Sequence, residues 1–188
     1  KLAKLGPATL RLWAAVLERV PDSRLLLKWR HATQPAARDR ILESLVDLGI
    51  AADRVEFRDA SPHDAMLAEY GDIDIALDPM PFSGGATTCD ALWMGVPVVT
   101  LHGSRFASNH TVSHLNAAGL PELVAAHPDE YVDICARLAS DVPALDRLRT
   151  GLREQLRHSP LCSPALFMRP AERHVETLLR DAAAQRFA

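Results

Sequence analysis

The sequence predicts an α/β fold, a doubly wound parallel sheet followed by a helical C-terminal tail, and three observations indicate it. Short apolar runs alternate along the chain with longer segments in which apolar residues recur every three or four positions, as in amphipathic helices. Proline and glycine separate these segments. A helix therefore connects each strand to the next, which makes the strands parallel and covers both faces of the sheet.

Five apolar runs are expected to form the strands. The first is Arg24-Leu-Leu-Leu-Lys-Trp29, and Val98-Val-Thr-Leu101 follows the turn residues Gly95 and Pro97. Runs this short, bounded by turn residues, are typical of strands buried in a parallel sheet. The predicted strands are 24–29, 54–57, 73–77, 98–101 and, as a last short strand, 122–125.

The remaining segments have the apolar periodicity and the end signals of helices. Pro7 suits the first turn of a helix, where its missing N–H does no harm, and Gly49 suits a helix end. Ser61 is placed to cap the helix that follows it. The expected helices are 7–20, 35–48, 62–70, 85–94 and 107–118, followed by the tail helices 128–140, 143–157 and 164–186.

The chain is expected to be a single lobe, residues 1–188, in which residues 128–188 form the helical tail. Its length allows one domain with a hydrophobic core and not clearly two. A doubly wound nucleotide-binding domain usually begins with a strand, whereas this chain begins with a helix. We therefore expect a fragment that lacks its first strand, just before Lys1.

Composition excludes several function classes. The formal net charge is -3 and the basic residues are spread along the chain, so no basic block indicates nucleic acid or an anionic membrane. No apolar run approaches the roughly 20 residues that a membrane span needs. Cys89, Cys135 and Cys162 are widely spaced, which is typical of a reducing compartment and argues against a disulfide framework or a zinc site. We expect a cytoplasmic location.

The chemistry is expected in the segment Asp78-Pro-Met-Pro-Phe-Ser-Gly-Gly-Ala-Thr-Thr-Cys-Asp90, because open parallel sheets bind ligands beyond the carboxyl ends of their strands. Its two glycines let the backbone approach a phosphate. The helix start that follows offers free N–H groups and the hydroxyls of Thr87 and Thr88. Asp90 lies within one turn and is placed to accept hydrogen bonds from a ribose. The segment therefore suits a nucleoside diphosphate.

The same residues have a plainer interpretation, which spacing alone leaves open. Two glycines before a helix are often only a turn, and Thr87 could simply cap the helix. Lys4, before the first helix, could meet a diphosphate as a mobile charge or be a solvated surface lysine. His63 could donate to a phosphate or a nucleobase edge, or be an exposed or capping side chain. His110 could face the same cleft or only solvent.

Other catalytic signatures are missing from the sequence. No Gly-x-Gly-x-x-Gly follows the first strand and no Gly-Lys-[Ser/Thr] occurs, which excludes the dinucleotide fingerprint and the P-loop. No Gly-x-Ser-x-Gly occurs, and no pair of carboxylates is convincingly placed for glycoside hydrolysis. Hydrolase readings are therefore disfavoured.

The sequence from Leu77 to Thr100 resembles the C-terminal catalytic lobe of the protein O-GlcNAc transferase family, which includes SPINDLY-type and bacterial members. The flanking segments 4–13, 107–115, 140–149 and 159–161 resemble the same lobe. The resemblance implies a Rossmann-like lobe of a two-lobed GT-B glycosyltransferase, often preceded by tetratricopeptide repeats that hold acceptor proteins. It implies transfer of a sugar from a nucleotide diphosphate to a protein Ser or Thr hydroxyl, with inversion and without a metal or other cofactor.

The resemblance also implies roles for individual residues. Lys4 takes the place of the catalytic lysine that contacts the diphosphate and stabilises the leaving group. Asp90 takes the place of the ribose-binding acid, and Ser61 and His63 fall where the family contacts the base. The substrate-binding positions carried over are Ser61, His63, Gly85, Ala86, Thr87, Thr88 and Asp90.

Departures from the family pattern leave the donor open. Gly85-Ala86 replaces the His-Thr of the O-GlcNAc branch, which weakens the contacts to the sugar phosphate. The stretch Thr87-Thr-Cys-Asp-Ala-Leu-Trp-Met-Gly-Val-Pro97 leans toward the SPINDLY-type branch, which includes protein O-fucosyltransferases that use GDP-fucose. The donor is therefore UDP-GlcNAc or GDP-fucose.

The acceptor side and the proposed base of the family lie mainly in the N-terminal lobe, so this chain alone is expected not to turn over. A non-catalytic nucleotide-binding or protein-interaction module is the alternative from another class. A two-lobed enzyme acting on small sugars, such as an epimerase, matches the central block less well.

Overall fold

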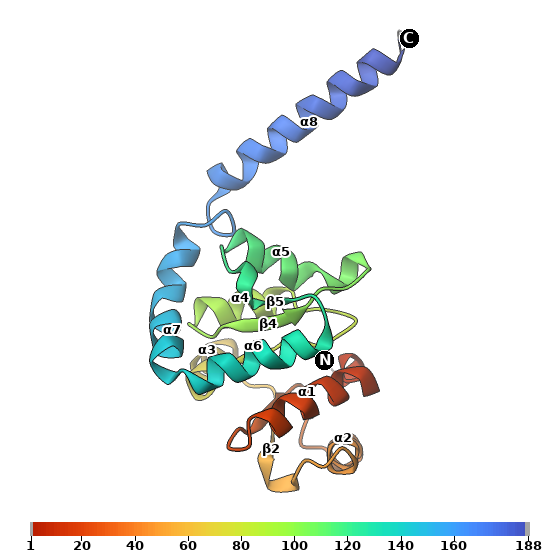
Figure 1. Ribbon diagram of the computed structural model, residues 1–188, viewed down its shortest axis with the longest axis vertical. Coiled ribbons are helices and arrows are strands. Elements are labelled where there is room, and N and C mark those ends of the chain that lie inside the picture. The colour runs from red at the N-terminus through yellow and green to blue at the C-terminus, as the bar shows by residue number, and fades with distance from the viewer. Residues whose placement is uncertain (1, 187–188) are drawn as a thin grey trace.

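The computed structural model describes residues 2–186 and shows an α/β lobe from which one long helix projects (Figure 1). Adjacent residues of the central strand, Val98 and Val99, are only 3% and 0% exposed. Side chains of adjacent strand residues point to opposite faces, so both faces of the sheet are covered. No helix in the described part of the chain has the length and apolar character needed to cross a bilayer.

Five strands are present, all in parallel pairs, but they form two sheets. β1 (Leu25–Lys28) pairs with β2 (Val55–Arg58), with Leu25 opposite Val55. β3 (Ala76–Leu77), β4 (Val98–Leu101) and β5 (Val124–Ala125) form a three-stranded sheet in that order. The predicted parallel strands are confirmed. The prediction of a single sheet is not met in the described residues, because β1 and β3 do not pair with each other.

The helices match the predicted positions closely. α1 and α6 pack against each other, and α6 also packs on β4 and β5, so this helix pair joins the two sheets over one hydrophobic core. The helices are α1 (Pro7–Arg19), α2 (Pro35–Asp47), α3 (His63–Ala68), α4 (Ala86–Trp93), α5 (His110–Ala117), α6 (Pro128–Ser140), α7 (Val142–Arg157) and α8 (Pro164–Arg186).

Several predicted boundaries were wrong because short 3-10 turns replace strand or helix ends. Residues Glu69–Asp72 form a 3-10 turn after α3, and Pro121–Leu123 form one before β5. The predicted strand 73–77 is reduced to its last two residues, since only these pair with β4. Ser61 does not cap α3: Pro62 holds the cap position and no side chain caps it there.

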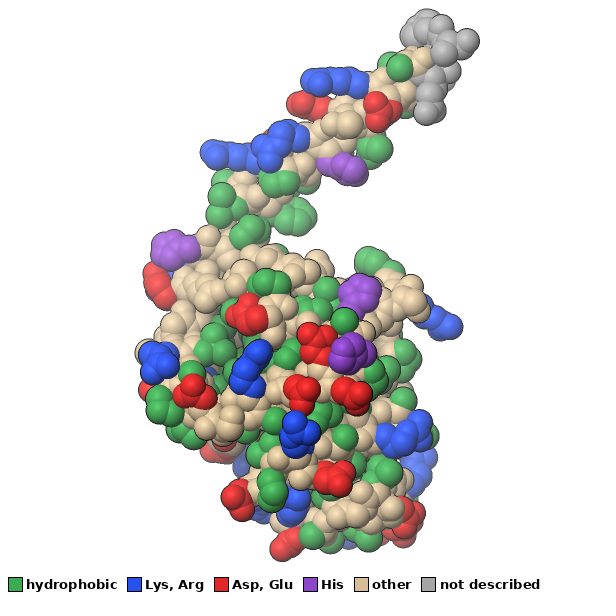
Figure 2. Space-filling model, viewed as in Figure 1, with side chains coloured by type: hydrophobic (Ala, Val, Ile, Leu, Met, Phe, Trp, Pro, Cys, Tyr) green, Lys and Arg blue, Asp and Glu red, His purple; other side chains and the backbone are tan. Residues whose placement is uncertain are grey.

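The predicted helical tail is present, but its parts differ in packing. α6 belongs to the core, since Tyr131 is fully buried, and α7 packs on α4 and α6. α8 instead projects away from the lobe (Figure 1) and carries apolar side chains along its length (Figure 2). Its exposed apolar residues are Leu166, Phe167, Met168, Val175, Leu178 and Leu179.

Candidate functional site

The loop after β3 is folded by a buried carboxylate. Asp78 is 5% exposed; one of its oxygens accepts the Gly84 N–H at 2.6 Å and the other accepts the Thr100 hydroxyl at 2.6 Å. Burial raises the pKa of Asp78, and these hydrogen bonds act against the shift. Asp78 thereby closes the loop, which contains a cis Met80-Pro81 bond, and sets Gly84 at the start of α4.

The two glycines of the loop have different surroundings. A Cβ at Gly84 would lie 2.2 Å from the Thr88 Oγ1 and 3.0 Å from an Asp78 carboxylate oxygen, so only glycine fits without displacement. A Cβ at Gly85 would meet nothing within 4 Å. The first glycine is required by packing, and the second faces open space.

The N-terminus of α4 is open. Gly85 holds the N-cap position without a side-chain cap, so the predicted alternative that Thr87 caps the helix is wrong. Ala86 and Thr87 are exposed at this end. Thr88 is buried instead, and its hydroxyl lies 3.1 Å from that of Thr111 in α5. The uncapped N–H groups and the positive end of the helix dipole favour an anion here.

Lys4 lies against this loop although it is far away in the sequence. Its Nζ donates to the Ser83 carbonyl at 2.7 Å and lies 4.5 Å from the centre of the Phe82 ring. The Thr9 hydroxyl, at the start of α1, donates to the Met80 carbonyl at 2.6 Å. The structure therefore brings Lys4 to the same loop end as Gly84 and the start of α4.

His110, at the start of α5, lies in an aromatic cluster with Phe82 of this loop and with Phe106. Its ring meets those of Phe82 and Phe106 edge to face, at centroid distances of 5.9 and 4.9 Å. Phe106 is 87% exposed. His110 thus borders the loop through ring contacts.

Asp90 is half-buried on α4 and lies near Tyr70, a residue of the 3-10 turn before β3. The Tyr70 hydroxyl donates to the Thr87 carbonyl at 3.3 Å. Burial raises the pKa of Tyr70 to about 12, and the charge of Asp90 adds to the shift. Tyr70 therefore stays protonated and gives the helix start a hydroxyl beside the carboxylate.

Ser61 and His63 lie apart from the loop, at the carboxyl end of β2. The Ser61 hydroxyl donates to Glu69 at 2.8 Å, and His63 is exposed at the start of α3. Neither residue lines the cavity that contains Lys4, Gly84 and Thr88.

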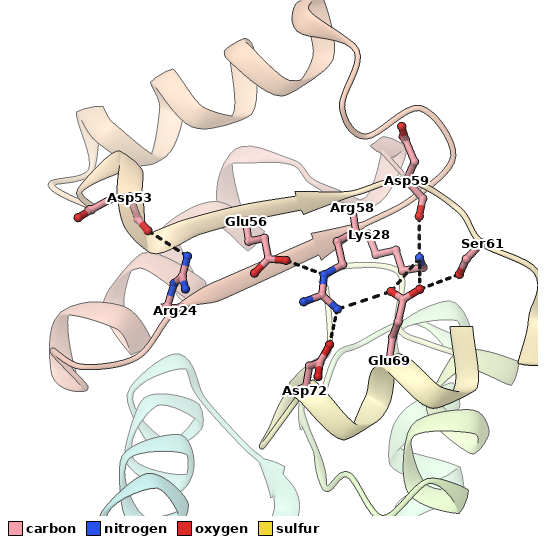
Figure 3. A network of polar contacts seen from close by, with 9 residues as sticks. All are labelled: Arg24, Lys28, Asp53, Glu56, Arg58, Asp59, Ser61, Glu69 and Asp72. Atoms are coloured by element: carbon pink, nitrogen blue, oxygen red, sulfur yellow. Dashed lines mark hydrogen bonds and ion pairs between the residues drawn. The ribbon is translucent and has the colours of Figure 1, made fainter. Parts of the chain in front are cut away.

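A network of ion pairs holds the segment after β2, which contains Ser61 and His63, in place (Figure 3). Glu69 accepts from Lys28 of β1 as well as from Ser61, and both hydrogen bonds lower the pKa of Glu69. Arg58 of β2 donates to Asp72 at 2.6 Å. The network ties the turn at Glu69–Asp72 to the ends of β1 and β2 and thereby fixes Ser61.

Sequence reasoning missed three residues of this site. Tyr70 and Phe82 were read only as parts of a helix and a loop, and Glu69 was not singled out. Each contacts a residue that is distant in the sequence. Tyr70 contacts Thr87, 17 positions away; Phe82 contacts Lys4, 78 positions away; and Glu69 contacts Lys28, 41 positions away. No local pattern marks such contacts, although an aromatic residue inside a Gly- and Pro-rich loop is a signal worth following.

Comparisons with known proteins agree on one family. Residues 1–169 match the family described as Glycosyl transferase family 41. A probable UDP-N-acetylglucosamine–peptide N-acetylglucosaminyltransferase SPINDLY of Solanum lycopersicum is 45% identical over 173 residues, which are 91% of this chain and 18% of that protein. A UDP-N-acetylglucosamine–peptide N-acetylglucosaminyltransferase of Caenorhabditis elegans is 34% identical over 150 residues, 79% of this chain and 13% of that protein. The chain thus spans less than a fifth of these relatives.

A solved structure agrees with the fold as well. A mutant O-GlcNAc transferase of Thermobaculum terrenum superposes with a TM-score of 0.86 at 40% identity, covering 98% of this chain and 35% of that chain. The predicted Rossmann-like lobe of a GT-B glycosyltransferase and the predicted resemblance are both confirmed. The chain belongs to glycosyl transferase family 41.

Proposed function

We propose that this chain is the donor-binding lobe of an inverting glycosyltransferase that moves a sugar from a nucleoside diphosphate to Ser or Thr hydroxyls of proteins. The observation that carries the proposal is the placement of Lys4 beside the uncapped start of α4, in a chain of this family. Relatives named as peptide N-acetylglucosaminyltransferases support a nucleotide-sugar donor and a protein acceptor.

The diphosphate is assigned to the start of α4. Its oxygens would accept from the N–H groups of Ala86 and Thr87 and from the Thr87 hydroxyl, while Thr88 braces the helix from inside. The ammonium of Lys4 would add a full positive charge. Negative charge grows on the diphosphate as the bond to the sugar breaks, and fixed donors at that point stabilise the transition state. Lys4 is therefore the proposed catalytic residue, and no metal is assigned a step.

The nucleoside is assigned to the surface beside this helix. Asp90 would accept hydrogen bonds from ribose hydroxyls, with Tyr70 next to it. Ser61 and His63 would contact the base from the segment that Glu69 fixes. The donor stays open between UDP-GlcNAc and GDP-fucose, and a Cβ at Gly85 would meet no atom within 4 Å.

The acceptor protein and the general base are assigned to parts of a longer protein outside this chain, so the chain alone is expected to bind donor weakly and not to turn over. A cytoplasmic location stays a prediction.

Calorimetric titration of the chain with UDP and with GDP tests the proposal. Binding of one nucleotide is expected, with a loss of about tenfold or more in affinity for Lys4→Ala and for Asp90→Ala. Arg19→Ala is the matched control, because Arg19 lies at the other end of α1, roughly 20 Å along the helix, and pairs with exposed Asp133. Unchanged affinity in both site variants would contradict the residue assignments.

The alternative is a non-catalytic interaction module, and the exposed apolar side chains of α8 favour it. Large apolar residues that stay exposed along one helix often mark a contact with another protein or domain. If the chain binds neither UDP nor GDP, this alternative replaces the first proposal.

A further inference from the structure

Two of the three cysteines belong to segments that meet on the surface of the lobe. Cys89 is half-buried in α4, and Cys162 is exposed in the turn between α7 and α8. All three cysteines are free thiols, but Cys135 is only 1% exposed and lies inside the core. The packing of α7 on α4 indicates how Cys89 lies relative to the turn that contains Cys162.

The contacts between α4 and α7 follow one order along the two helices. A Cβ at Gly95, just after α4, would lie 2.8 Å from the Arg149 carbonyl oxygen. One turn further along α7, Arg153 donates to the Trp93 carbonyl at 2.8 Å. Another turn on, the guanidinium of Arg157 lies 5.7 Å from the centre of the Trp93 ring. The contacts therefore move backward along α4 as they move forward along α7.

Cys89 and Cys162 continue this order. Cys89 lies one turn before Trp93 on the same face of α4, and the turn that contains Cys162 follows the end of α7 at Arg157. Burial is the largest cause that raises the pKa of Cys89, followed by the charges of Asp90 and of Cys162. An interaction between charges fades with distance, so this coupling of the two thiols supports the proximity that the helix contacts indicate.

The turn after α7 is held against the lobe. Ser159 is 7% exposed, and its hydroxyl donates to the Leu156 carbonyl at 2.7 Å and accepts the Leu161 N–H at 3.2 Å. Leu161 packs against the hydrophobic core, and the Cys162 N–H donates to the Ser159 carbonyl at 3.1 Å. Cys162 is therefore exposed but anchored in a defined turn.

From these contacts we propose that Cys89 and Cys162 form a reversible disulfide when the protein meets a hydroperoxide. The bond joins α4, whose first turn is the candidate phosphate site, to the segment from which α8 projects (Figure 1). Because α8 begins at Pro164, two residues after Cys162, oxidation fixes the base of the projecting helix against the lobe. The disulfide requires no nucleotide, so the proposal is independent of the donor site.

The reaction is a two-electron oxidation of the two thiols by one molecule of peroxide. The exposed Cys162 reacts first, as its thiolate: an S–O bond forms, the O–O bond breaks, and the released oxygen takes up a proton and leaves as water or an alcohol. The Cys89 thiolate then attacks the sulfur of the Cys162 sulfenic acid, which forms the S–S bond and expels hydroxide, and this is protonated to water. The two thiols thus lose two electrons and two protons, and the peroxide gains them.

Cys135 provides an internal control. Burial raises the pKa of its thiol to about 12, so it stays protonated and shielded in the folded chain. Cys135 is 27 positions from Cys162 in the sequence, whereas Cys89 is 73 positions away. The shorter loop closes more readily in an unfolded chain, so oxidation of unfolded protein favours a bond between Cys135 and Cys162. The crosslinked pair therefore reports whether the native contacts direct the reaction.

Peroxide treatment of the reduced chain, followed by alkylation and non-reducing peptide mapping, tests the proposal. Equimolar hydrogen peroxide is expected to give an intramolecular crosslink between Cys89 and Cys162, with Cys135 alkylated only after denaturation. The crosslink closes a long loop, so it is expected to raise Tm by about 5 °C or more, and dithiothreitol is expected to reverse the rise. Cys135→Ser is the matched control and is expected to form the same crosslink.

The Cys89→Ser variant separates the two steps of the reaction. Its Cys162 sulfenic acid lacks the second thiol and is expected to be trapped by dimedone, whereas wild type gives the disulfide. Crosslinks to Cys135, disulfide dimers between molecules, or thiols that stay reduced would each overturn the proposal. A crosslink that lowers Tm would overturn it as well, because the bond would then form only by distorting the native positions of the two residues.

Discussion

The loop after β3 and the segment after β2 both follow parallel strands, but they are held in opposite ways. The first is closed by a carboxylate that is 5% exposed, Asp78, with two hydrogen bonds of 2.6 Å. The second is held by several ion pairs whose side chains stay in contact with water, such as Arg58 with Asp72, at 27% and 57% exposure. A buried polar group that loses its hydrogen-bond partner lowers stability considerably, whereas each exposed ion pair contributes little to stability. The loop after β3 is therefore rigidly specified, and the segment after β2 tolerates change.

The largest effect is expected for Asp78→Ala. Removing the carboxylate leaves the Gly84 N–H and the Thr100 hydroxyl without their partner in a buried place, which we expect to lower the free energy of unfolding by about 3 kcal/mol. Urea denaturation measures it. Asp72→Ala in the exposed network is the matched control and is expected to cost less than about 1 kcal/mol. Equal losses in the two variants would break the comparison.

Substituting the two adjacent glycines of the loop after β3 compares a tightly packed position with one that faces open space. Gly84→Ala is expected to cost about 2 kcal/mol, because its Cβ would lie 2.2 Å from the Thr88 Oγ1. Gly85→Ala meets no atom within 4 Å and is expected to change stability by less than about 0.5 kcal/mol. The midpoint of urea unfolding reports both. A larger loss at Gly85 than at Gly84 would contradict the packing described for the loop.

The neighbouring residues Thr87 and Thr88 provide a second comparison between an exposed and a buried side chain. Thr88→Val removes the buried hydroxyl that faces Thr111, and we expect a loss of about 1 kcal/mol in unfolding free energy. Thr87→Val changes an exposed side chain, so stability is expected to stay the same while nucleotide affinity falls. Calorimetry and urea denaturation of both variants give the two readouts. If Thr87→Val lowers stability and leaves affinity intact, the assignment of Thr87 is wrong.

The smallest effect is expected at Glu69, a partly buried residue of the same network, and it depends on pH. Hydrogen bonds from Lys28 and Ser61 hold the pKa of Glu69 below its ordinary value of 4.5. A carboxylate with a lowered pKa stabilises the fold above the pKa of the unfolded chain, and this stabilisation is lost as the pH falls through the folded-state pKa. Wild type is therefore expected to exceed Glu69→Gln in stability at pH 7, by less than about 1 kcal/mol, with the difference vanishing in acid.

Urea denaturation at several pH values measures this difference. Glu154→Gln, in an exposed ion pair of α7, serves as the comparison. The same pH dependence in both variants would mean that the network at Glu69 has no special effect.

Much of this lobe follows from local pattern. The strand Val98–Leu101 and the helix Pro128–Ser140 have the predicted limits, because continuous apolar runs and Pro or Gly at the ends specify them within the segment itself. The open start of α4 was also predictable, since Gly-Gly before a helix leaves its N-terminus without a side-chain cap. The proximity of Lys4 to this helix start came from the resemblance and from βα topology.

Contacts between distant segments were not predictable in the same way. The length of β3 depends on its neighbours, so an apolar run of five residues yields only two paired ones, Ala76 and Leu77. Asp78 was read as part of an anion-binding segment, but its carboxylate closes the loop through Thr100, 22 positions away. Ser61 is a residue type that often caps helices, but its hydroxyl donates to Glu69, eight positions away, instead. In each case tertiary packing chose among local alternatives of similar energy.

The adjacent glycines divide the freedom of this loop to evolve. A mutation at Gly84 must be matched at once by changes in Asp78 or Thr88, because all three share one packed volume. At position 85 a single mutation can introduce a side chain, because a Cβ there would face open space next to the start of α4. Under the proposed function, new donor preferences can arise at this one position while the fold and the phosphate grip remain as they are. The loop thus contains one glycine that packing requires, Gly84, directly beside one that can be substituted, Gly85.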